Sequence, residues 1–322
     1  MAVTNTNKLP MKKIIIILLF FGLTFTGYAQ SPTNSDLKKS QLNGHTFLDY
    51  SQSNNAFITT SLMINVGVGS TSTITIPPID INGVSTPAIN GTIMFAETGI
   101  NYQQRFTPWL SLNINAIMVG RFGVNAFSLL FDGVNTISGG SIGWRIRMIR
   151  TKKLILTTGV FVKNLNGNFI NIKQFVNDAI DGDPNASIVK NTPAMAEGIN
   201  FEGTYAINET WGLQAATQWA YGESFVRGKE SFTSKTSFLG EADFYPKHKL
   251  PLGIGLGYML SSVPEISMEG GDYLSLGILK LAYTGSTDFD LGVEYLTYKM
   301  KLSNRLKNPL VTQLILSLKF YF

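Results

Sequence analysis

The sequence contains no cysteine among its 322 residues, and this absence removes several kinds of chemistry at once. Disulfide bonds, thiolate metal sites, a cysteine nucleophile and a lipid anchor on cysteine are all excluded. Histidine is almost as scarce, because His45 and His248 are the only two. We therefore predict no metal site, no cofactor-binding site and no catalytic residue, and we expect that the protein is not an enzyme.

Charged residues are also scarce, at 15% of the chain, whereas aromatic residues reach 11% and glycine occurs 31 times. Soluble proteins usually carry about 25% charged residues. The formal net charge is only +5, and three of the lysines lie near the N-terminus in a segment that we expect to be removed. Nothing in this balance indicates binding to nucleic acid.

The chain has no apolar run long enough for a membrane-spanning helix, which needs about 20 residues. The unbroken run 14–21 is much shorter, and it follows Met11-Lys12-Lys13. Gly27-Tyr28-Ala29 then places small residues at the two positions that a signal peptidase reads. We predict that residues 1–29 are a secretory signal peptide rather than a membrane helix, with the natural start at Met1 or Met11.

The last thirteen residues read LVTQLILSLKFYF and alternate with a period of two, which predicts a strand. One face carries Leu310, Leu314, Leu316, Leu318, Phe320 and Phe322, and Thr312 is its exception. An apolar face that would be a hazard on a soluble edge strand is a requirement on a lipid-facing one. This ending resembles the C-terminal signature of Gram-negative outer-membrane β-barrel proteins. The resemblance implies a bacterial outer-membrane location, contact with lipid, and recognition by the barrel assembly machinery through Phe320 and Phe322.

Strand-like segments recur from Phe57 onward, and several alternate clearly between apolar and polar residues. We predict twelve strands: 57–69, 92–106, 109–121, 137–150, 154–165, 196–206, 211–222, 231–245, 252–263, 272–284, 288–301 and 310–322. Twelve is even, as in bacterial single-chain barrels. The predicted fold is therefore all-β, a transmembrane antiparallel up-and-down barrel over residues 57–322. The pattern is poorer at 272–284, where a β-bulge is one explanation.

The connections between these segments alternate in length. Those after odd strands are long, such as 70–91 and 166–195, and those after even strands are tight, such as Thr107-Pro108. Outer-membrane barrels have short periplasmic turns and longer extracellular loops, so we place both termini in the periplasm. Aromatic residues gather at the tight-turn end, as expected at a membrane interface: Phe106, Trp109, Tyr205, Trp211, Phe244, Tyr245, Tyr283 and Phe289.

Residues 30–56 are mostly polar and weakly patterned, and they precede the predicted barrel. Two hypotheses fit this segment: a flexible periplasmic arm, or a plug that folds into the barrel. The arm is the simpler expectation, because terminal segments are often poorly ordered.

Strand phase also predicts which charged residues face the lumen, the interior of the barrel. The basic set comes from the second to fifth strands, and the acidic set from the eighth and eleventh. The predicted lumen-lining residues are Arg105, Arg121, Arg145, Arg147, Lys163, Glu241, Asp243, Asp290 and Glu294. Either these charges pair across a packed lumen, or water fills the lumen and they create a transverse field. A barrel of about eight strands is packed and one of about sixteen is open, so twelve leaves both alternatives.

Two motifs invite a chemical interpretation that the sequence does not support. Residues 253–257 read GIGLG but lie within a predicted strand and precede no helix, so small inward side chains for packing explain them better than phosphate binding. Residues 181–185 read DGDPN, yet Ala186 and Thr192 occupy positions where a calcium loop needs Gly and Glu.

The sequence therefore favours a narrow outer-membrane channel or transporter for small polar or anionic solutes. A structural or partner-binding barrel with a packed lumen, acting through its long loops, is the alternative. A transporter of hydrophobic ligands and an outer-membrane hydrolase are less favoured, the latter because neither histidine lies on a strand face beside a serine.

Overall fold

The computed structural model describes residues 40–322 except 77–79, 82–83, 86–87, 123–132, 171–174, 176–177, 179, 226–228, 264–272 and 301–307. The predicted signal peptide and the N-terminal part of the 30–56 segment lie outside the described residues. A closed antiparallel barrel accounts for most of the chain. Its strands are β3 (Ser61–Thr71), β8 (Met94–Thr107), β9 (Leu110–Phe122), β10 (Gly133–Arg150), β11 (Leu154–Ile170), β12 (Val189–Ala206), β13 (Trp211–Glu223), β14 (Glu230–Asp243), β15 (Leu252–Ser261), β16 (Leu274–Tyr283), β17 (Phe289–Lys299) and β18 (Leu310–Tyr321).

The predicted all-β, twelve-stranded barrel is confirmed, and each strand pairs with its sequence neighbours. The seam is closed by β18 and β3, with Leu316 opposite Val66 and Tyr321 opposite Ser61. Closure leaves the wall without a free edge, so every strand finds backbone partners on both sides within the membrane.

Two details of the sequence prediction are wrong. The first strand begins at Ser61 rather than Phe57, because Phe57 and Ile58 are buried in the interior segment that precedes β3. The bulge suggested for 272–284 is absent from β16, which keeps a continuous register with both β15 and β17. Both faces of β16 are apolar because Leu276 and Ile278 pack in the lumen while the opposite face meets lipid.

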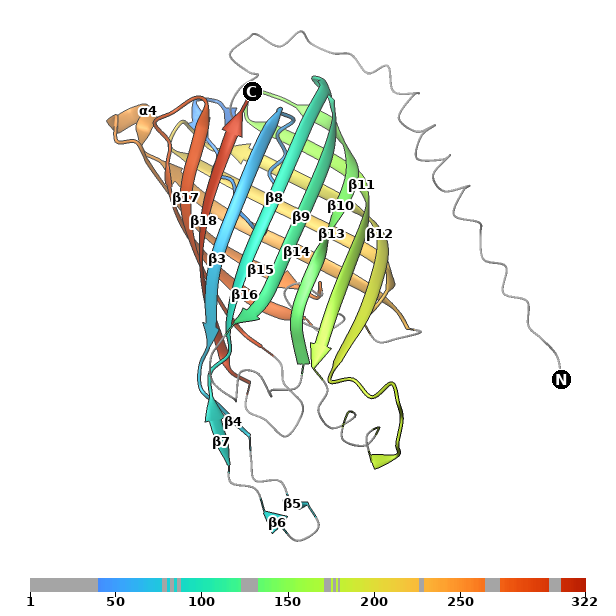
Figure 1. Cartoon of the computed structure of the whole chain (residues 1–322). Coiled ribbons are helices and arrows are strands. Elements are labelled where there is room, and N and C mark those ends of the chain that lie inside the picture. Colours follow the sequence, from blue (N-terminus) through green and yellow to red (C-terminus); the bar gives the residue numbers. More distant parts are fainter. Residues whose placement is uncertain are drawn as a thin grey trace, which may run out of the picture.

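The two ends of the barrel differ as loop lengths predict. Figure 1 shows the C-terminus at the same end as the short helix α4 (Tyr245–His248), which lies in the turn between β14 and β15. Two small hairpins extend the β3–β8 connection at the opposite end. They consist of β4 (Ile74–Ile76) with β7 (Ile89–Gly91) and of β5 (Asp80–Ile81) with β6 (Val84–Ser85). We call these the turn end and the loop end.

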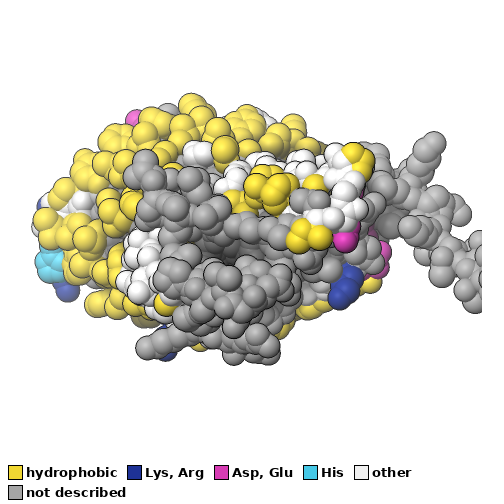
Figure 2. Space-filling model, turned by 60° about the horizontal axis from the view of Figure 1, so that its bottom comes forward, with side chains coloured by type: hydrophobic (Ala, Val, Ile, Leu, Met, Phe, Trp, Pro, Cys, Tyr) yellow, Lys and Arg dark blue, Asp and Glu magenta, His cyan; other side chains and the backbone are white. Residues whose placement is uncertain are grey.

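The outer wall of the barrel is apolar. Figure 2 shows hydrophobic side chains over much of the visible surface. Val66, Leu256 and Leu316 in mid-strand are each more than half exposed. A soluble protein rarely exposes so large an apolar surface, whereas the hydrocarbon core of a bilayer requires it. Phe106, Trp211 and Phe322 are exposed at the turn end, consistent with an aromatic belt at one membrane interface. The protein is therefore an outer-membrane barrel.

Among the residues that the structure describes, none of the helices has the length and apolar character needed to cross a bilayer.

The interior is occupied at the turn end by the segment that precedes β3. This segment, residues 40–60, contains β1 (Gln41–Leu42) and β2 (His45–Thr46) and is mostly buried, with Gln41, Asn43 and Gly44 exposed. From Ser40 onward, most of its side chains lie in the barrel interior. We refer to residues 40–60 as the plug.

Candidate functional site

The plug begins with a tight hairpin whose turn is Asn43-Gly44. Both residues have positive φ, 51° and 82°, and β1 pairs with β2 across them. Asn-Gly is the dipeptide that two-residue hairpin turns prefer, because it tolerates left-handed backbone at both positions. This local signal stands in the sequence at 43–44 and predicts an ordered hairpin.

Carboxylates of β14 bind the backbone that follows this hairpin. Glu241 accepts hydrogen bonds from the Leu48 amide at 3.2 Å and the Tyr50 hydroxyl at 3.3 Å. Its other oxygen lies 3.3 Å from Nε2 of His45, and neither side chain has exposed surface. Asp243 accepts a hydrogen bond from the Thr46 amide at 3.2 Å. One acidic pair on the wall therefore holds residues 45–50 in place.

A second attachment lies on β16 and β17. Glu294 accepts hydrogen bonds from the backbone amide and the hydroxyl of Ser51, at 2.7 and 2.9 Å. Lys280 Nζ lies 3.0 Å from Glu294 Oε1 and also donates to the carbonyl of Asp49. Since Lys280 and Glu294 are both buried, each charge is neutralised by its partner and by the plug backbone.

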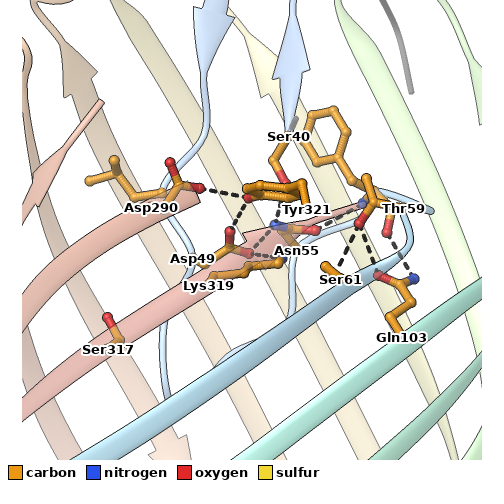
Figure 3. Close-up of polar contacts among 12 residues, drawn as sticks. Ser40, Asp49, Asn55, Thr59, Ser61, Gln103, Asp290, Ser317, Lys319 and Tyr321 are labelled. Carbon is orange, nitrogen blue, oxygen red and sulfur yellow. Dashed lines mark hydrogen bonds and ion pairs between the residues drawn. The ribbon is translucent and has the colours of Figure 1, made fainter. Parts of the chain in front are cut away.

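The last strand provides a third attachment, on the face opposite its lipid-facing residues. Asp49 accepts hydrogen bonds from Lys319 at 2.8 Å and from the Tyr321 hydroxyl at 2.6 Å, as Figure 3 shows. Asp290 of β17 lies 2.6 Å from the same hydroxyl. Asn55 reaches Asp49 from the far end of the plug and joins its two halves.

Arg145 forms the fourth attachment, on β10. Its guanidinium donates to the backbone carbonyls of Asn55 and Phe57 and lies 3.5 Å from Glu202. Beside it, the Thr157 hydroxyl donates to the Ala56 carbonyl at 2.6 Å. Arg145 and Glu202 are 4% and 3% exposed, so this ion pair is enclosed by the wall and the plug.

Small residues on the wall make room for the larger plug side chains. A Cβ on Gly212 would overlap His45 and Phe47, and one on Gly255 would overlap Tyr50. These glycines lie where the plug approaches the wall, so the GIGLG segment does serve packing. Phe47 and Phe57 pack together with ring centroids 5.5 Å apart, next to Ile155 and Ala206 of the wall.

Tyr50 is a large, fully buried side chain of the plug. Burial, followed by the negative charges of Glu241 and Glu294, raises the pKa of Tyr50 well above its ordinary value. The side chain is therefore a neutral hydrogen-bond donor at any physiological pH. Its ring also lies 5.3 Å from Lys280 Nζ, which adds a cation–π contact.

A polar cavity of about 150 Å³ lies in the lumen beside residues 51–54 of the plug. Its lining includes two acids, Glu97 and Glu202, and two lysines, Lys163 and Lys235. Most of the remaining polar lining consists of amides and hydroxyls: Ser51, Gln52, Ser53, Asn54, Asn65, Asn101, Asn115, Ser141, Asn200, Thr217, Gln218 and Ser237. The charges balance in sign, so the cavity is polar without strongly favouring ions of one sign.

Apolar side chains replace polar ones toward the loop end. One cluster, which extends from Leu48 and Tyr50, includes Met259, Leu276 and Ile315. A smaller one on the other wall contains Ile137, Leu165 and Phe225. The described lumen thus has three levels: the plug, the polar cavity and an apolar zone.

The structure brings many of the predicted lumen residues together around the plug. Glu241, Asp243, Glu294 and Arg145 bind plug atoms directly, and Asp290 binds the hydroxyl of Tyr321. Lys163 lines the cavity instead.

Three of the predicted arginines lie apart from these contacts. Arg105 and Arg147 are partly buried at the turn end, and Arg121 is partly buried at the loop end. The backbone amide of Arg105 donates a hydrogen bond to the Thr60 hydroxyl. The opposed basic and acidic walls that the sequence suggests are thus bridged by the plug at the turn end.

Sequence reasoning did not place Lys280, Glu202 or His45 in the barrel interior. Lys280 could not be assigned to the lumen, because both faces of its strand are apolar and alternation does not show which face points inward. His45 required knowledge that the segment 40–60 enters the barrel, for which Asn43-Gly44 was the available signal.

The other chemical motifs remain without a binding geometry. The DGDPN loop is exposed, and Asp183 accepts a hydrogen bond from the Asn185 amide at 2.8 Å. In the described part of the chain, no group of three or more acidic or histidine side chains is arranged to hold a metal ion. Residues 127–131 read FSLLF, an apolar run that suits either an inward-folded constriction or a hydrophobic-ligand site, and they lie outside the described residues.

Three solved outer-membrane proteins are similar to the chain over most of its length. An outer-membrane channel from Pseudomonas putida F1 is 11% identical, with 86% of this chain and 100% of that one covered and a TM-score of 0.46. The NanC porin is 9% identical, with coverage of 80% and 100% and a TM-score of 0.45. A Pseudomonas aeruginosa FadL homologue is 10% identical, with coverage of 91% and 99% and a TM-score of 0.43. No family model matches the chain, and no curated protein sequence matches it.

Proposed function

We propose that the protein is an outer-membrane channel for small polar solutes and that the plug closes its periplasmic end. The observation that carries this proposal is the polar cavity directly against the plug. A solute that reached the cavity from the loop end would be stopped by residues 51–54, so passage requires the plug to move.

The chemistry of the plug contacts supports this function. A segment that served only to fill the lumen would be held at least as well by apolar packing, because buried ion pairs contribute little net stability. Here the attachments at Glu241, Glu294 and Arg145 are hydrogen bonds to plug backbone atoms. Water or a polar solute can replace such hydrogen bonds one by one as the plug moves. The contacts of an interlocked apolar core cannot be replaced in this way.

The balanced lining favours polar over anionic solutes. Two lysines and two glutamates line the cavity, and Arg145 is already paired with Glu202. An anion would meet carboxylates as well as ammonium groups. The cavity therefore supports polar solutes better than the anionic solutes that the basic strands suggested.

A barrel with a permanently packed lumen is the second candidate function. The apolar clusters around Leu276 and Ile137 favour it, because they fill part of the loop end. Such a protein would act through its extracellular loops and would not conduct in any state.

Single-channel recording in planar bilayers separates the two candidates. The first variant combines Gly212→Ala with Gly255→Ala, which overlaps His45, Phe47 and Tyr50 without removing any charge. Gly240→Ala is the matched control, because a Cβ there meets only Leu213 at an ordinary 3.8 Å. A second variant lacks residues 40–59.

We expect small, infrequent openings from the wild type and the control, and larger or more frequent openings from both plug variants. Heat-modifiable migration on gels shows that each protein is folded. If the folded plug variants remain silent, the channel proposal is wrong and the packed-lumen candidate stands.

A further inference from the structure

The side of the plug that faces the cavity consists of four consecutive polar residues, Ser51-Gln52-Ser53-Asn54. All four line the cavity. Three of them are partly exposed, whereas the stretches on both sides, 45–50 and 55–59, are buried. None of the four carries an apolar side chain, so hydrogen bonds rather than burial of apolar surface hold this part of the plug. We refer to residues 51–54 as the gate loop.

Each side chain of the gate loop contacts a different strand of the barrel. The four hydrogen bonds join Ser51 Oγ to Glu294 of β17 at 2.9 Å, Gln52 Nε2 to Glu97 of β8 at 3.0 Å, Ser53 Oγ to Ser237 Oγ of β14 at 2.7 Å, and Asn54 to Glu202 of β12. In the closed order of the barrel, at least one other strand separates each of these four strands from the next. The gate loop therefore reaches the wall in four directions and crosses the lumen.

The residues at the two ends of the gate loop are fixed independently of it. Asp49 accepts hydrogen bonds from Lys319 and Tyr321 of β18, as Figure 3 shows. The carbonyl of Asn55 accepts one from Arg145 of β10. Asn55 Nδ2 also lies 2.5 Å from Asp49 Oδ1, so the two ends are joined to each other. The loop can therefore leave its four contacts without displacing either end.

The rest of the plug is held more strongly than the gate loop. Phe47, Leu48 and Phe57 bury apolar side chains in clusters that include residues of the wall. Burying such a side chain stabilises a structure more than a hydrogen bond that water can replace. Proteins open locally where few apolar contacts hold a segment. The gate loop is therefore the part of the plug that opens first.

We propose that residues 51–54 are the moving gate of the channel and that the rest of the plug stays in place while a solute passes. The proposal rests on the channel function, because it identifies the part of the plug that moves. Opening then breaks the contacts of four residues. Release of the whole plug would also break the ion pair of Asp49 with Lys319 and expose Phe47 and Phe57.

Reversible disulfides test which part moves, because the chain has no cysteine of its own. Ser53→Cys with Ser237→Cys joins the gate loop to β14, where the two hydroxyl oxygens lie 2.7 Å apart. Gly44→Cys with Glu209→Cys joins the plug hairpin to the turn between β12 and β13, where a Cβ on Gly44 would lie 3.3 Å from that of Glu209. Each full-length variant is recorded in planar bilayers before and after reduction, and heat-modifiable migration shows that it is folded.

The two disulfides have opposite expected results. Oxidation of the first pair should abolish openings, and reduction should restore them. Oxidation of the second pair should leave the openings unchanged, because the hairpin stays in place in the open channel. Loss of openings under the second disulfide would show that the whole plug moves and would overturn the proposal.

A substitution without cysteine gives a second test. Gln52→Ala removes the contact with Glu97 and should raise the frequency of openings about tenfold, the effect of one hydrogen bond to a charged group. Gln41→Ala, at an exposed position of β1, is the matched control and should leave the frequency unchanged. Equal frequencies in the two folded variants would count against the gate loop.

The gate and the channel can fail separately. Openings that continue under the disulfide between positions 53 and 237 refute the gate loop and leave the channel intact. Silence of every folded variant, oxidised or reduced, refutes the channel function itself.

Discussion

Asp49 and Lys319 lie 270 positions apart in the chain and meet inside the barrel, with Oδ1 2.8 Å from Nζ. One belongs to the plug and the other to β18. β18 therefore contacts lipid with one face and binds the plug with the other. Leu314, Leu316 and Phe320 face outward, while Lys319 and Tyr321 hold the plug.

Deletion of Phe322 should lower the amount of folded barrel in outer-membrane fractions. Phe322 is 64% exposed, so the loss removes little internal packing. The expected defect is in recognition by the assembly machinery and in anchoring at the membrane interface. The measurement is the heat-modifiable band on semi-native gels, with Phe322→Tyr as the control that keeps the aromatic ring. A normal yield from the deletion would count against a role of Phe322 in assembly.

A tag inserted next to Asp183 should be labelled on intact cells, and a tag at His248 should not. Asp183 is exposed at the loop end, whereas His248 ends helix α4 at the turn end. The short turns of outer-membrane barrels face the periplasm. Permeabilised cells provide the control, because both tags should then be labelled. The reverse pattern on intact cells would invert the orientation of the barrel.

Arg145→Met should loosen the plug and increase conductance. The substitution removes the donors to the Asn55 and Phe57 carbonyls and leaves Glu202 buried without its cation. Removing one partner of a buried pair costs about 3–5 kcal/mol. Protease cleavage within residues 40–60 should also become faster. Lys152→Met, in an exposed turn, is the matched control. Unchanged conductance and unchanged cleavage in the folded variant would show that Arg145 does not hold the plug.

Leu276→Ala should destabilise the barrel more than Leu279→Ala does. Leu276 is fully buried in the lumen, where truncation leaves a cavity and costs about 2–5 kcal/mol. Leu279 lies on the opposite face of β16 and is 40% exposed, so lipid fills the space that its truncation leaves. Urea unfolding in lipid vesicles measures the difference. Equal effects would mean that the apolar zone does not contribute packing energy.

The wall of the barrel could be predicted from the sequence because the alternation within each strand shows which residues face lipid and which face the lumen. In β18, a period of two separates Leu314 and Leu316 from Gln313 and Ser317 without reference to any other strand, and the structure has the same faces. β16 is the exception, since Leu276 and Leu279 lie on opposite faces and are both apolar. Where the lumen is apolar, alternation no longer distinguishes inside from outside.

The plug could not be predicted in the same way. Its contacts join residues that are far apart in the chain, such as His45 and Glu241, separated by 196 positions. A polar segment shows no regular period when its partners are buried charges on several strands, among them β10, β14, β16, β17 and β18. Gly212 and Gly255 leave space on the wall that plug side chains fill. The sequence alone does not show which residues occupy that space.

The position of the plug also constrains the order in which the protein folds. Residues 40–60 come directly before β3, and β3 closes the barrel against β18, the last barrel strand in chain order. If the seam formed first, Lys319 and Glu241 would be sealed inside without Asp49, His45 and the Leu48 amide, at a cost of several kcal/mol for each buried charge. Burial of these charges therefore favours a folding order in which residues 40–60 are seated before β3 and β18 pair.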